Sequence, residues 1–511
     1  MSKVKTEKTD SDRPARKSGA AEIAITFESL IITFALVLVW RAFVMEAYRI
    51  PTGSMAETLM GTHFRLRCPQ CGYKYDYGFV SERYGLSRDT IPRSSVRKVT
   101  SRCPSCGYHQ PAGGAMPVAN GDRILVLKCI YQFFEPRQWD IAVFKDPRDP
   151  ATNLIKRLLG RPGETVEIID GDVYIDGRIS RKPPRVQNEL WMPVYDNDYQ
   201  PARPREGLFN GHPWRQPFKN VANSKWEIDE GNAAQFRLAS PAGEIHRLIY
   251  DSSIGNDFRA TYAYNDVRGY NHMPYCSDLM VRFYATSSEL DGVIGISLSK
   301  YQTYYKAWVD YSGEMVIAKV SEGKETVLDS KTIKMWALGK SVLVKFVNVD
   351  HQLIFEFGPE KLVYDLGRSA DDAGLRKTNV EPQVKIFGSG RLTLSHIGIF
   401  RDVHYTARKF ADSGDFGRAI EGNPLTLGKD EFFMLGDNSP NSEDSRWWDR
   451  AGRGNNNIFY RKGIVPRDYL VGKAMLVYWP GGFKPFAKFP IAVIPNVGRM
   501  RFIYGGSSKN Q

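Results

Sequence analysis

One short stretch holds a hydroxyl side chain in a setting that could do chemistry. In Ile50-Pro51-Thr52-Gly53-Ser54-Met55, a proline is followed by a threonine, a glycine and a serine. Proline fixes its own φ, and glycine lets the backbone approach another segment closely, so the turn could hold Ser54 out for attack on a carbonyl carbon. An ordinary surface turn has the same composition, so these residues alone leave both interpretations open.

A serine nucleophile needs a neighbouring base, and the sequence offers a lysine more readily than a histidine. None of the eight histidines has a motif-like setting, so a Ser–His–Asp triad gains no support. Lys156 lies in the apolar stretch Leu154–Leu159. Burial against apolar walls lowers the pKa of a lysine from about 10.4 by several units and makes the amine available as a base. The alternative is an outward-facing lysine on a strand.

A separate pattern of cysteines indicates a metal. Four of the six cysteines form two near copies of one motif, Cys68-Pro-Gln-Cys71-Gly and Cys103-Pro-Ser-Cys106-Gly. Each resembles a zinc knuckle, and four thiolates would make a tetrahedral structural zinc site. Two disulfides are an alternative outside the cytoplasm. A redox CxxC is a further one, although it normally opens a helix, and the glycine after each pair argues against that.

The elements that must position these residues begin with an apolar run at residues 23–45, long enough to cross a bilayer. The run is too long for a signal peptide, and the residues after Met45 make a poor cleavage site. We therefore expect a retained transmembrane helix. The basic tail before it is expected to stay in the cytoplasm, with everything after Met45 outside.

The rest of the sequence predicts a mainly β protein. Short alternating strands with turn signals about every ten residues, including a hairpin around Asp170-Gly171, indicate an all-β barrel or sandwich. Residues 182–421 differ in composition, being rich in Trp, Tyr and Asn, and contain many short alternating runs. They predict a second β-sandwich, loosely similar to lectin-like jelly rolls. The strand pattern seen before residue 182 resumes at Leu427, so we interpret the sandwich as an insertion in a single catalytic domain.

Together these patterns divide the chain into eight segments, three of which belong to one catalytic β domain. They are a disordered cytoplasmic tail (1–22), a transmembrane helix (23–45), the first catalytic β segment (46–66), a zinc-ribbon-like insertion (67–111), the second catalytic β segment (112–181), an inserted β-sandwich (182–426), the third catalytic β segment (427–485) and a C-terminal tail (486–511).

The net charge of +13 is compatible with anionic partners, but no recognition helix or RNA-binding motif accompanies it. We therefore expect no nucleic-acid partner. The basic loop between the two cysteine pairs either contacts anionic lipid or is simply solvated. The remaining cysteines, Cys129 and Cys276, are expected to be unpaired core residues.

Three boxes in this order carry a family resemblance. The Ile50–Met55 stretch, Ile155-Lys156-Arg157 with the following Gly-x-Pro-Gly, and residues 436–446 (GDNSPNSEDSR) resemble the signature boxes of bacterial type I signal peptidase, the leader peptidase family of membrane-bound Ser/Lys endopeptidases. The strand after Gly121-Asp122 matches that family's intervening box. The resemblance covers under half of the chain, and it implies a signal-peptidase-like β-barrel as the catalytic fold.

The resemblance implies a role for each catalytic residue. Ser54 would attack the scissile carbonyl, and Lys156 would be the general base. Ser442 matches the hydroxyl that orients the lysine amine. Thr52 stands where the family has a serine hydroxyl that joins the nucleophile's backbone N–H in the oxyanion hole. Such a donor contributes about 3 kcal/mol of transition-state stabilisation.

The resemblance also implies supporting residues. Asp444 and Arg446 match an ion pair that braces the site, although a surface pair would contribute under about 1 kcal/mol. Ser439-Pro440 departs from the family's charged pair, which affects the detail of this loop and no catalytic role. Structural support is also expected from Gly436, Asp437 and Asn438. The walls of the shallow pockets for the A-x-A end of a signal peptide are expected from Ile50, Pro51, Met55, Leu59, Leu154 and Ile155.

The implied activity is endoproteolytic removal of signal peptides from secreted preproteins, through an acyl-enzyme, at the outer face of the cytoplasmic membrane. No catalytic cofactor is expected, and the partners are signal peptides and the bilayer. The basic loop between the cysteine pairs is a candidate contact for the secretion machinery, with a solvated loop as the alternative. One alternative is a membrane-anchored protein that binds glycan or peptide through its sandwich on a decayed catalytic fold; the intact Ser54, Lys156 and Ser442 argue against decay. Another is a self-cleaving protease of the repressor type, but the Ala-Gly linker to a DNA-binding domain that it needs is not visible.

Overall fold

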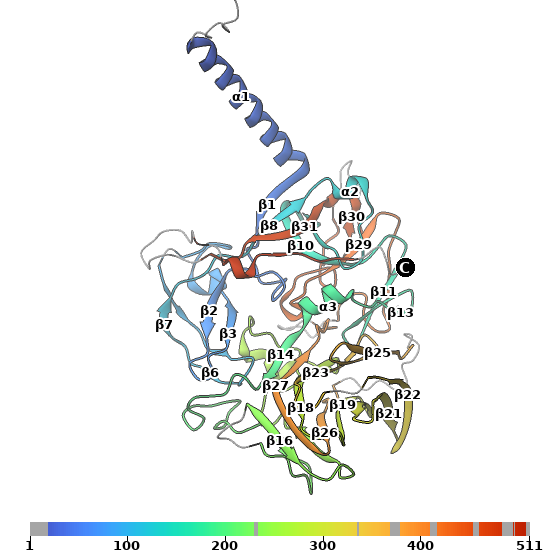
Figure 1. Ribbon diagram of the computed structural model, residues 1–511. Helices are drawn as coiled ribbons and strands as arrows, with labels where there is room; N and C mark the ends of the chain where they lie inside the picture. Colours follow the sequence, from blue (N-terminus) through green and yellow to red (C-terminus); the bar gives the residue numbers. More distant parts are fainter. Residues whose placement is uncertain are drawn as a thin grey trace, which may run out of the picture.

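The computed structural model of the 511-residue chain describes residues 19–92, 94–228, 234–334, 337–367, 379–408, 416–452, 459–482, 494 and 496–506. It is mainly β, with one long helix projecting from one end (Figure 1). The tail predicted at 1–22 lies outside the described residues up to residue 18.

The projecting helix, α1 (Gly19–Val39), continues as a π-helical turn, η1 (Trp40–Val44), and leads directly into β1 (Met45–Arg49). The stretch Ile23–Val44 has a mean hydropathy of 2.2, and none of it is buried against the rest of the protein. A helix of 22 residues that is this apolar, and that packs against no other described part of the protein, is long enough to cross a bilayer. The predicted N-terminal apolar helix is therefore confirmed.

The sheet nearest α1 has eight strands in the order β1-β8-β31-β9-β10-β29-β30, with β32 paired to β31. Its strands come from three distant parts of the chain, which places the stretches singled out in the sequence beside one another. Their bounds are β8 Arg123–Leu127, β9 Ile141–Asp146, β10 Asp149–Gly160, β29 Glu431–Leu435, β30 Val465–Pro466, β31 Leu470–Trp479 and β32 Arg501–Phe502.

A second, four-stranded sheet packs beside it in the order β13-β12-β11-β28. The predicted hairpin is confirmed: its turn is at Asp170 and Gly171, whose φ values of 51° and 86° suit a type I′ turn. The bounds are β11 Thr165–Ile169, β12 Asp172–Ile175, β13 Arg178–Ile179 and β28 Leu425–Thr426; the short helices nearby are α2 Ile130–Phe133 and α3 Pro184–Leu190.

The cysteine-containing region forms a small module of three two-stranded sheets around its own apolar cluster. The pairs are β2 (His63–Arg67) with β3 (Lys74–Gly78), β4 (Val96–Lys98) with β7 (Gly113–Met116), and β5 (Ser101–Arg102) with β6 (His109–Gln110). Phe209, from the middle of the chain, is fully buried in the same cluster, so the module is packed against the insertion and does not stand alone.

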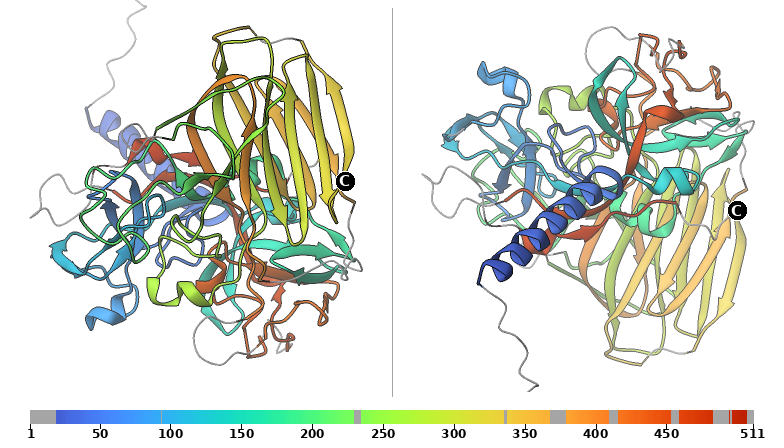
Figure 2. Two further views of the ribbon diagram at one scale, coloured as in Figure 1. Left: turned by 90° about the horizontal axis from the view of Figure 1, so that it is seen from below. Right: turned by 90° about the horizontal axis from the view of Figure 1, so that it is seen from above.

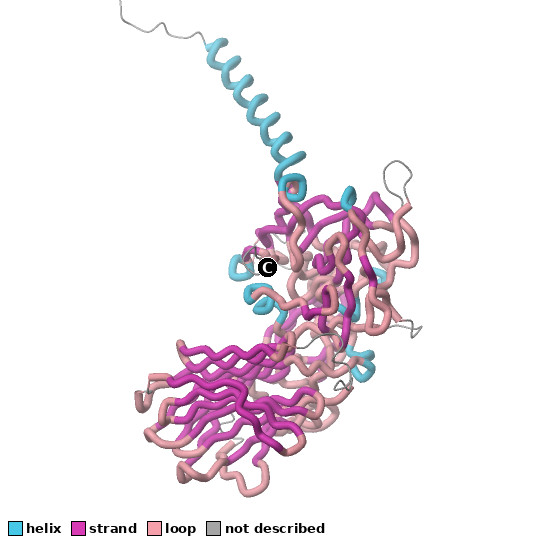
Figure 3. The backbone as a smooth tube through the Cα atoms, turned by 90° about the vertical axis from the view of Figure 1, so that its right-hand side faces the viewer, coloured by secondary structure: helices cyan, strands magenta, loops and turns pink. Residues whose placement is uncertain are grey.

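The predicted β-sandwich is present as two seven-stranded sheets. It forms the lobe farthest from α1 (Figures 1 and 3), and its strands run side by side as a broad yellow and orange layer in Figure 2. One sheet contains β14 Met192–Asp196, β16 Gln235–Ala239, β18 Leu279–Ser287, β23 Val342–Val349, β24 Gln352–Phe357, β25 Glu360–Asp365 and β27 Arg391–Arg401. The other contains β15 Phe218–Asn220, β17 His246–Tyr250, β19 Val293–Lys300, β20 Thr303–Asp310, β21 Glu314–Ser321, β22 Lys324–Thr332 and β26 Val384–Gly388.

The end of the chain returns to the eight-stranded sheet. After η9 (Val497–Arg499), β32 pairs with β31, and Ile503 is buried in the apolar cluster beneath β1. The Arg499 guanidinium donates to the Asp76 carboxylate at 2.6 Å. Of the segment predicted as a tail at 486–511, residues 496–506 are therefore a packed part of the structure.

Candidate active site

The turn that carries Ser54 follows β1 and is held in place through its backbone carbonyls. The Ser54 carbonyl accepts a hydrogen bond from the Asn438 N–H (3.1 Å). The Gly53 carbonyl accepts one from the Asn438 side-chain amide (2.9 Å). The Ser54 side chain is half-buried, so one residue of the third box fixes the backbone of the first while the serine stays within reach of solvent.

Gly436, at the end of β29, lies against both serines of interest. A Cβ at this position would stand 2.3 Å from Ser442 Oγ and 2.4 Å from the Ser54 carbonyl oxygen, so only glycine allows this approach. Ser442 is 4% exposed, and within the described residues its hydroxyl has no hydrogen-bond partner. A buried hydroxyl without a partner is uncommon and has capacity left for a group that moves into range.

Lys156 lies in β10 opposite Ala142 of β9 and is 3% exposed. The outward-facing lysine considered from the sequence is therefore excluded. Burial lowers the pKa of Lys156 from its ordinary 10.5 to about 8; the charge of Asp444 opposes this shift and that of Arg446 adds to it. About a tenth of such a lysine is neutral at pH 7, compared with one in several thousand for an exposed one.

Asp444 is not free to neutralise Lys156 because it is already paired. Arg446 donates to both of its carboxylate oxygens (2.9 and 2.7 Å), and both side chains are inaccessible to solvent. The Gly436 N–H donates to the same carboxylate at 3.1 Å. The pair predicted as a brace is thus fully buried, and it is not the weak surface pair considered as the alternative.

A second buried pair lies on the neighbouring residue of β10. Arg157 donates to both oxygens of Asp437 at 2.7 Å and to the Trp139 carbonyl at 3.0 Å. Burial alone would lower the pKa of Arg157, but the charge and hydrogen bonds of Asp437 outweigh it and raise that pKa. Sequence reasoning assigned Asp437 only a general supporting role and assigned Arg157 none; the adjacent charges in the two boxes were the available signal.

The structure separates the residues expected to form the substrate pockets into two groups. Ile50, Met55 and Leu59 are buried in one apolar cluster beneath the Ser54 turn, and Ile155 packs against that cluster. Pro51, Leu154 and Ile155 are half-buried and reach the surface. Met55 and Leu59 have no exposed area, so they support the turn from below. Thr52 is exposed at the tip of the turn.

Residues 262–265, from the middle of the chain, take part in the site and were missed from the sequence. The side-chain amides of Asn265 and Asn438 donate to each other at 2.7 and 2.8 Å. The Tyr262 hydroxyl donates to the Asp437 carbonyl at 2.8 Å. The Tyr264 ring covers Gly53 so closely that a Cβ there would lie 1.9 Å from it. No local motif marks these residues, because their partners lie far away along the chain.

The departure at Ser439 is explained by a second contribution from the inserted region. The Ser439 hydroxyl accepts from Arg446 Nη1 and from the Thr406 N–H, both at 2.8 Å. Arg446 also donates to the Thr406 carbonyl at 2.8 Å. The loop is thus anchored by the segment that follows β27 out of the sandwich, in place of a charged neighbour.

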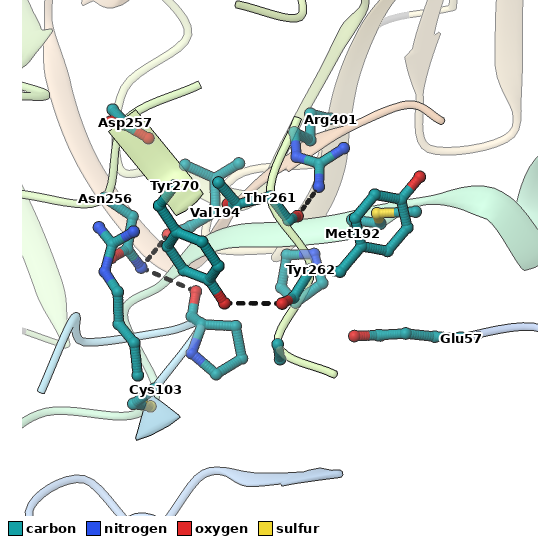
Figure 4. A pocket seen from close by; sticks show the side chains of 14 residues that line it. Glu57, Cys103, Met192, Val194, Asn256, Asp257, Thr261, Tyr262, Tyr270 and Arg401 are labelled. Atoms are coloured by element: carbon teal, nitrogen blue, oxygen red, sulfur yellow. Dashed lines mark hydrogen bonds between the residues drawn. The ribbon is translucent and has the colours of Figure 1, made fainter. Parts of the chain in front are cut away.

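A small polar cavity of about 30 Å³ lies where the Ser54 turn, the cysteine module and the inserted region meet (Figure 4). Glu57 and Arg401 line it, and the Tyr270 hydroxyl donates to the Tyr262 carbonyl across it at 2.6 Å. Burial raises the pKa of Glu57. The volume suits one or two water molecules and is too small for a substrate.

The four cysteines of the two CxxC motifs converge in the module. Their sulfur atoms all lie within 4.8 Å of one another, with Cys68–Cys106 and Cys71–Cys103 separations of 3.7 Å. A tetrahedron with Zn–S bonds of about 2.3 Å has edges of about 3.8 Å, whereas a disulfide needs about 2.05 Å. The spacing therefore fits four ligands around one metal ion.

Comparison with known proteins agrees with this geometry. A family model described as "Signal peptidase, peptidase S26" matches residues 106–214 and 401–479, which contain Lys156 and the 436–446 box. Signal peptidase I of Rickettsia typhi is 31% identical over 157 residues, 30% of this chain and 44% of that protein. Signal peptidase I of Rickettsia bellii is 25% identical over 234 residues, 46% of this chain and 65% of that protein. The chain spans about half the length of the curated relatives it matches.

The carbohydrate-binding module CBM66 from Bacillus subtilis, a solved structure, is 12% identical and aligns over 36% of this chain and 92% of its own, with a TM-score of 0.20. A score this low supports no inference about the sandwich.

Proposed function

We propose that this chain, which carries a signal peptidase domain of the peptidase S26 family, is a type I signal peptidase that works with a serine and a lysine. One observation carries the proposal. The backbone of Ser54 and the hydroxyl of Ser442, which has no hydrogen-bond partner among the described residues, both lie against Gly436, while Lys156, buried in the same sheet, has a pKa lowered to about 8.

In this proposal the neutral amine of Lys156 takes the proton from the Ser54 hydroxyl as Ser54 Oγ attacks the scissile carbonyl carbon. The Ser442 hydroxyl supplies the hydrogen bond that orients the amine. The Ser54 N–H and the Thr52 hydroxyl stabilise the developing oxyanion. The lysine then gives its proton to the leaving amine, and a water molecule, activated by the same amine, hydrolyses the acyl-enzyme.

The substrate would be the end of a signal peptide with small A-x-A side chains. Pro51, Leu154 and Ile155, the half-buried members of the expected wall, reach the surface and lie close to Ser54 or Lys156 in the chain. The apolar helix ends one short strand before Ser54, which would place the site close to the bilayer surface. We place the N-terminus in the cytoplasm and the β domains outside the cytoplasmic membrane.

We also infer that Cys68, Cys71, Cys103 and Cys106 hold a structural zinc ion. Zinc prefers four thiolates at this spacing, and the glycine after each pair has the positive φ that a knuckle turn needs (78° at Gly72, 75° at Gly107). The ion would tie together a module too small to build a large core.

The test is cleavage of a purified preprotein with an A-x-A site by the full chain in detergent. We expect cleavage after that site by the wild type and by Lys145→Ala, which removes an exposed lysine from the neighbouring strand β9. Ser54→Ala and Lys156→Ala should lose activity by several orders of magnitude. Cleavage at wild-type rates by either variant would contradict the mechanism, and no cleavage by the wild type on several preproteins would favour the alternative of a binding protein.

A further inference from the structure

The outer face of one sandwich sheet carries a hollow of about 470 Å³. The sheet runs β15-β17-β26-β19-β20-β21-β22, and alternate residues of its strands point into the sandwich core, among them Ile294, Ile296 and Leu298. The other set of residues lines the hollow. A volume in this range is typical of small-molecule sites.

The strand register places these lining residues in three adjacent rows across the sheet. In the first row, Arg247 is opposite Phe387, Phe387 opposite Gly295, and Gly295 opposite Trp308. The second row joins Lys385, Ser297 and Lys306 in the same way. Tyr304, Val320 and Glu325 form a third row beside the second, on the strands nearest the sheet edge.

Small residues in the middle of these rows create the hollow. A Cβ on Gly295 would lie 2.3 Å from the tip of the Phe387 ring, so the glycine lets that ring lie across the sheet. Phe387 and Trp308 face each other with ring centroids 6.5 Å apart at 59°. The floor of the hollow is polar at Ser297, and its aromatic walls, Phe387 and Trp308, are only partly buried.

The charges around the hollow are mainly positive. Three cations, Arg247, Lys306 and Lys385, line it with one anion, Glu325, which pairs with Lys306. Lys385 lies over the Tyr304 ring, with its amine 4.7 Å from the ring centroid. Among the described residues, neither Arg247 nor Lys385 forms an ion pair. Burial and the neighbouring charges of Arg247 and Lys306 lower the pKa of Lys385, which is consistent with room for an added anion.

The position on the sheet restricts what can bind. Strands β17, β26, β19 and β20 each have partners on both sides, so their backbone groups are already paired and cannot bind a peptide by strand addition. A ligand must therefore use the side chains on the face. It needs flat apolar surface for the aromatic rings, hydroxyls for Ser297 and Tyr304, and a carboxylate for Arg247 and Lys385. A pyranose ring with a carboxyl group offers all three.

We propose that this hollow binds an acidic saccharide, with a uronate ring against Trp308 and Phe387 and its carboxylate between Arg247 and Lys385. The site would lie on the lobe farthest from α1 (Figure 1), apart from Ser54 and Lys156. It would let the membrane-anchored chain hold an anionic glycan without occupying the proposed peptidase site.

Isothermal titration calorimetry of the full chain in detergent tests the proposal. The probes are a short oligogalacturonate, a neutral cello-oligosaccharide of the same length, and a single-stranded DNA oligonucleotide. We expect binding of the oligogalacturonate alone, weakened by added salt. Trp308→Ala and Lys385→Gln should each weaken it by about tenfold or more, equivalent to about 1.4 kcal/mol.

The matched control is Tyr284→Ala, because Tyr284 is 41% exposed on the other sheet of the sandwich. It should bind oligogalacturonate like the wild type. All three variants should also cleave a preprotein at the wild-type rate. The binding titration itself requires no cleavage, so its outcome does not depend on the peptidase proposal. Absence of oligogalacturonate binding, equal binding of the neutral sugar, or preference for DNA would overturn the proposal. So would an unchanged affinity in Lys385→Gln, a surface variant whose folding a melting curve verifies.

Discussion

Lys156 and Arg157 are adjacent in β10, both are buried, and their pKa values move in opposite directions. The difference is in the carboxylates near them. Asp437 forms an ion pair with Arg157, whereas Asp444, the carboxylate near Lys156, forms its ion pair with Arg446. Among the described residues Lys156 forms no ion pair, so the cost of its desolvation dominates and favours its neutral form.

At the scale of this residue we predict how activity depends on pH. Because the general base must be neutral, kcat/KM should rise as the pH rises and level off above a pKa of about 8. Below that pH it should fall about tenfold for each pH unit. The measurement is initial cleavage rates across the range from acid to alkaline pH. A profile that stays flat on both sides of the Lys156 pKa would contradict a lysine base.

The same shift predicts an effect on stability. The folded pKa of about 8 lies below the ordinary 10.5, so between these pH values the unfolded chain binds the extra proton and stability rises with pH. Below the folded pKa the full penalty of charging Lys156 applies, up to about 3 kcal/mol. Lys156→Met should therefore raise the free energy of unfolding at neutral pH, and the gain should shrink as the pH approaches the unfolded pKa. Denaturant titrations of the wild type and Lys156→Met at neutral pH and at a pH near the unfolded pKa measure this gain in stability. A gain that does not depend on pH would point to packing alone.

At the scale of elements, the Ser54 turn depends on a segment of the insertion. The Asn438 side-chain amide donates one hydrogen bond to Asn265 Oδ1 and another to the Gly53 carbonyl. Asn265 thereby fixes the orientation of the amide that binds the turn. Tyr264 covers the same glycine. The sandwich insertion is therefore connected to the site through short, specific contacts.

We predict that Asn265→Ala lowers kcat with little change in KM. Two hydrogen bonds of about 1 kcal/mol each position the turn, so the loss of kcat should be up to about thirtyfold. The control is Asn271→Ala, which removes an exposed asparagine from the nearby helix η4 (Val267–His272). Steady-state kinetics with a preprotein substrate distinguishes the two. An effect confined to stability, with wild-type kcat in the folded fraction, would contradict a positioning role.

The cysteine module gives a second prediction at this scale. The purified chain should contain about one zinc ion, and Cys106→Ser should lose it and melt at a lower temperature, because the ligand set would be incomplete. Cys129→Ser, a change outside the cluster, should keep the metal. Elemental analysis and intact-mass measurement without reductant test this. A mass lower by four hydrogens, with no zinc, would show two disulfides instead.

At the scale of the whole molecule, buried charges join the four-stranded sheet to the sandwich. Lys300 of β19 pairs with Asp278 in the sandwich and lies 3.6 Å from Asp172 of β12. Lys182 pairs with both Asp350 and Asp402. The charges of Asp278 and Asp172 raise the pKa of Lys300 despite its burial, so it stays charged. This network spans both lobes, which favours their unfolding together.

We predict that Lys300→Met destabilises the protein by about 3 to 5 kcal/mol, because it leaves buried carboxylates without their cation. Calorimetry should show one transition for both lobes, shifted to lower temperature. Lys306→Met, which removes a partly exposed lysine from the adjacent strand β20, should have little effect on the same measurement. Two separate transitions in the wild type would contradict coupling through this network.

The sequence alone determined the features that depend on short-range chemistry. The apolar run at 23–45, the hairpin at Asp170-Gly171, the two CxxC motifs and the mainly β pattern follow from composition and local spacing, because a helix, a turn or a knuckle is specified by a few neighbouring residues.

The tertiary structure decided what depends on distant partners. Local patterns could not show that Lys156 is buried while the carboxylate near it, Asp444, pairs with Arg446. Nor could they show that Met55 and Leu59 are core residues, or that Asn265 and Thr406 contact the candidate site. These properties come from contacts between residues far apart along the chain, and such contacts exist only once the strands have paired and each carboxylate has taken its partner.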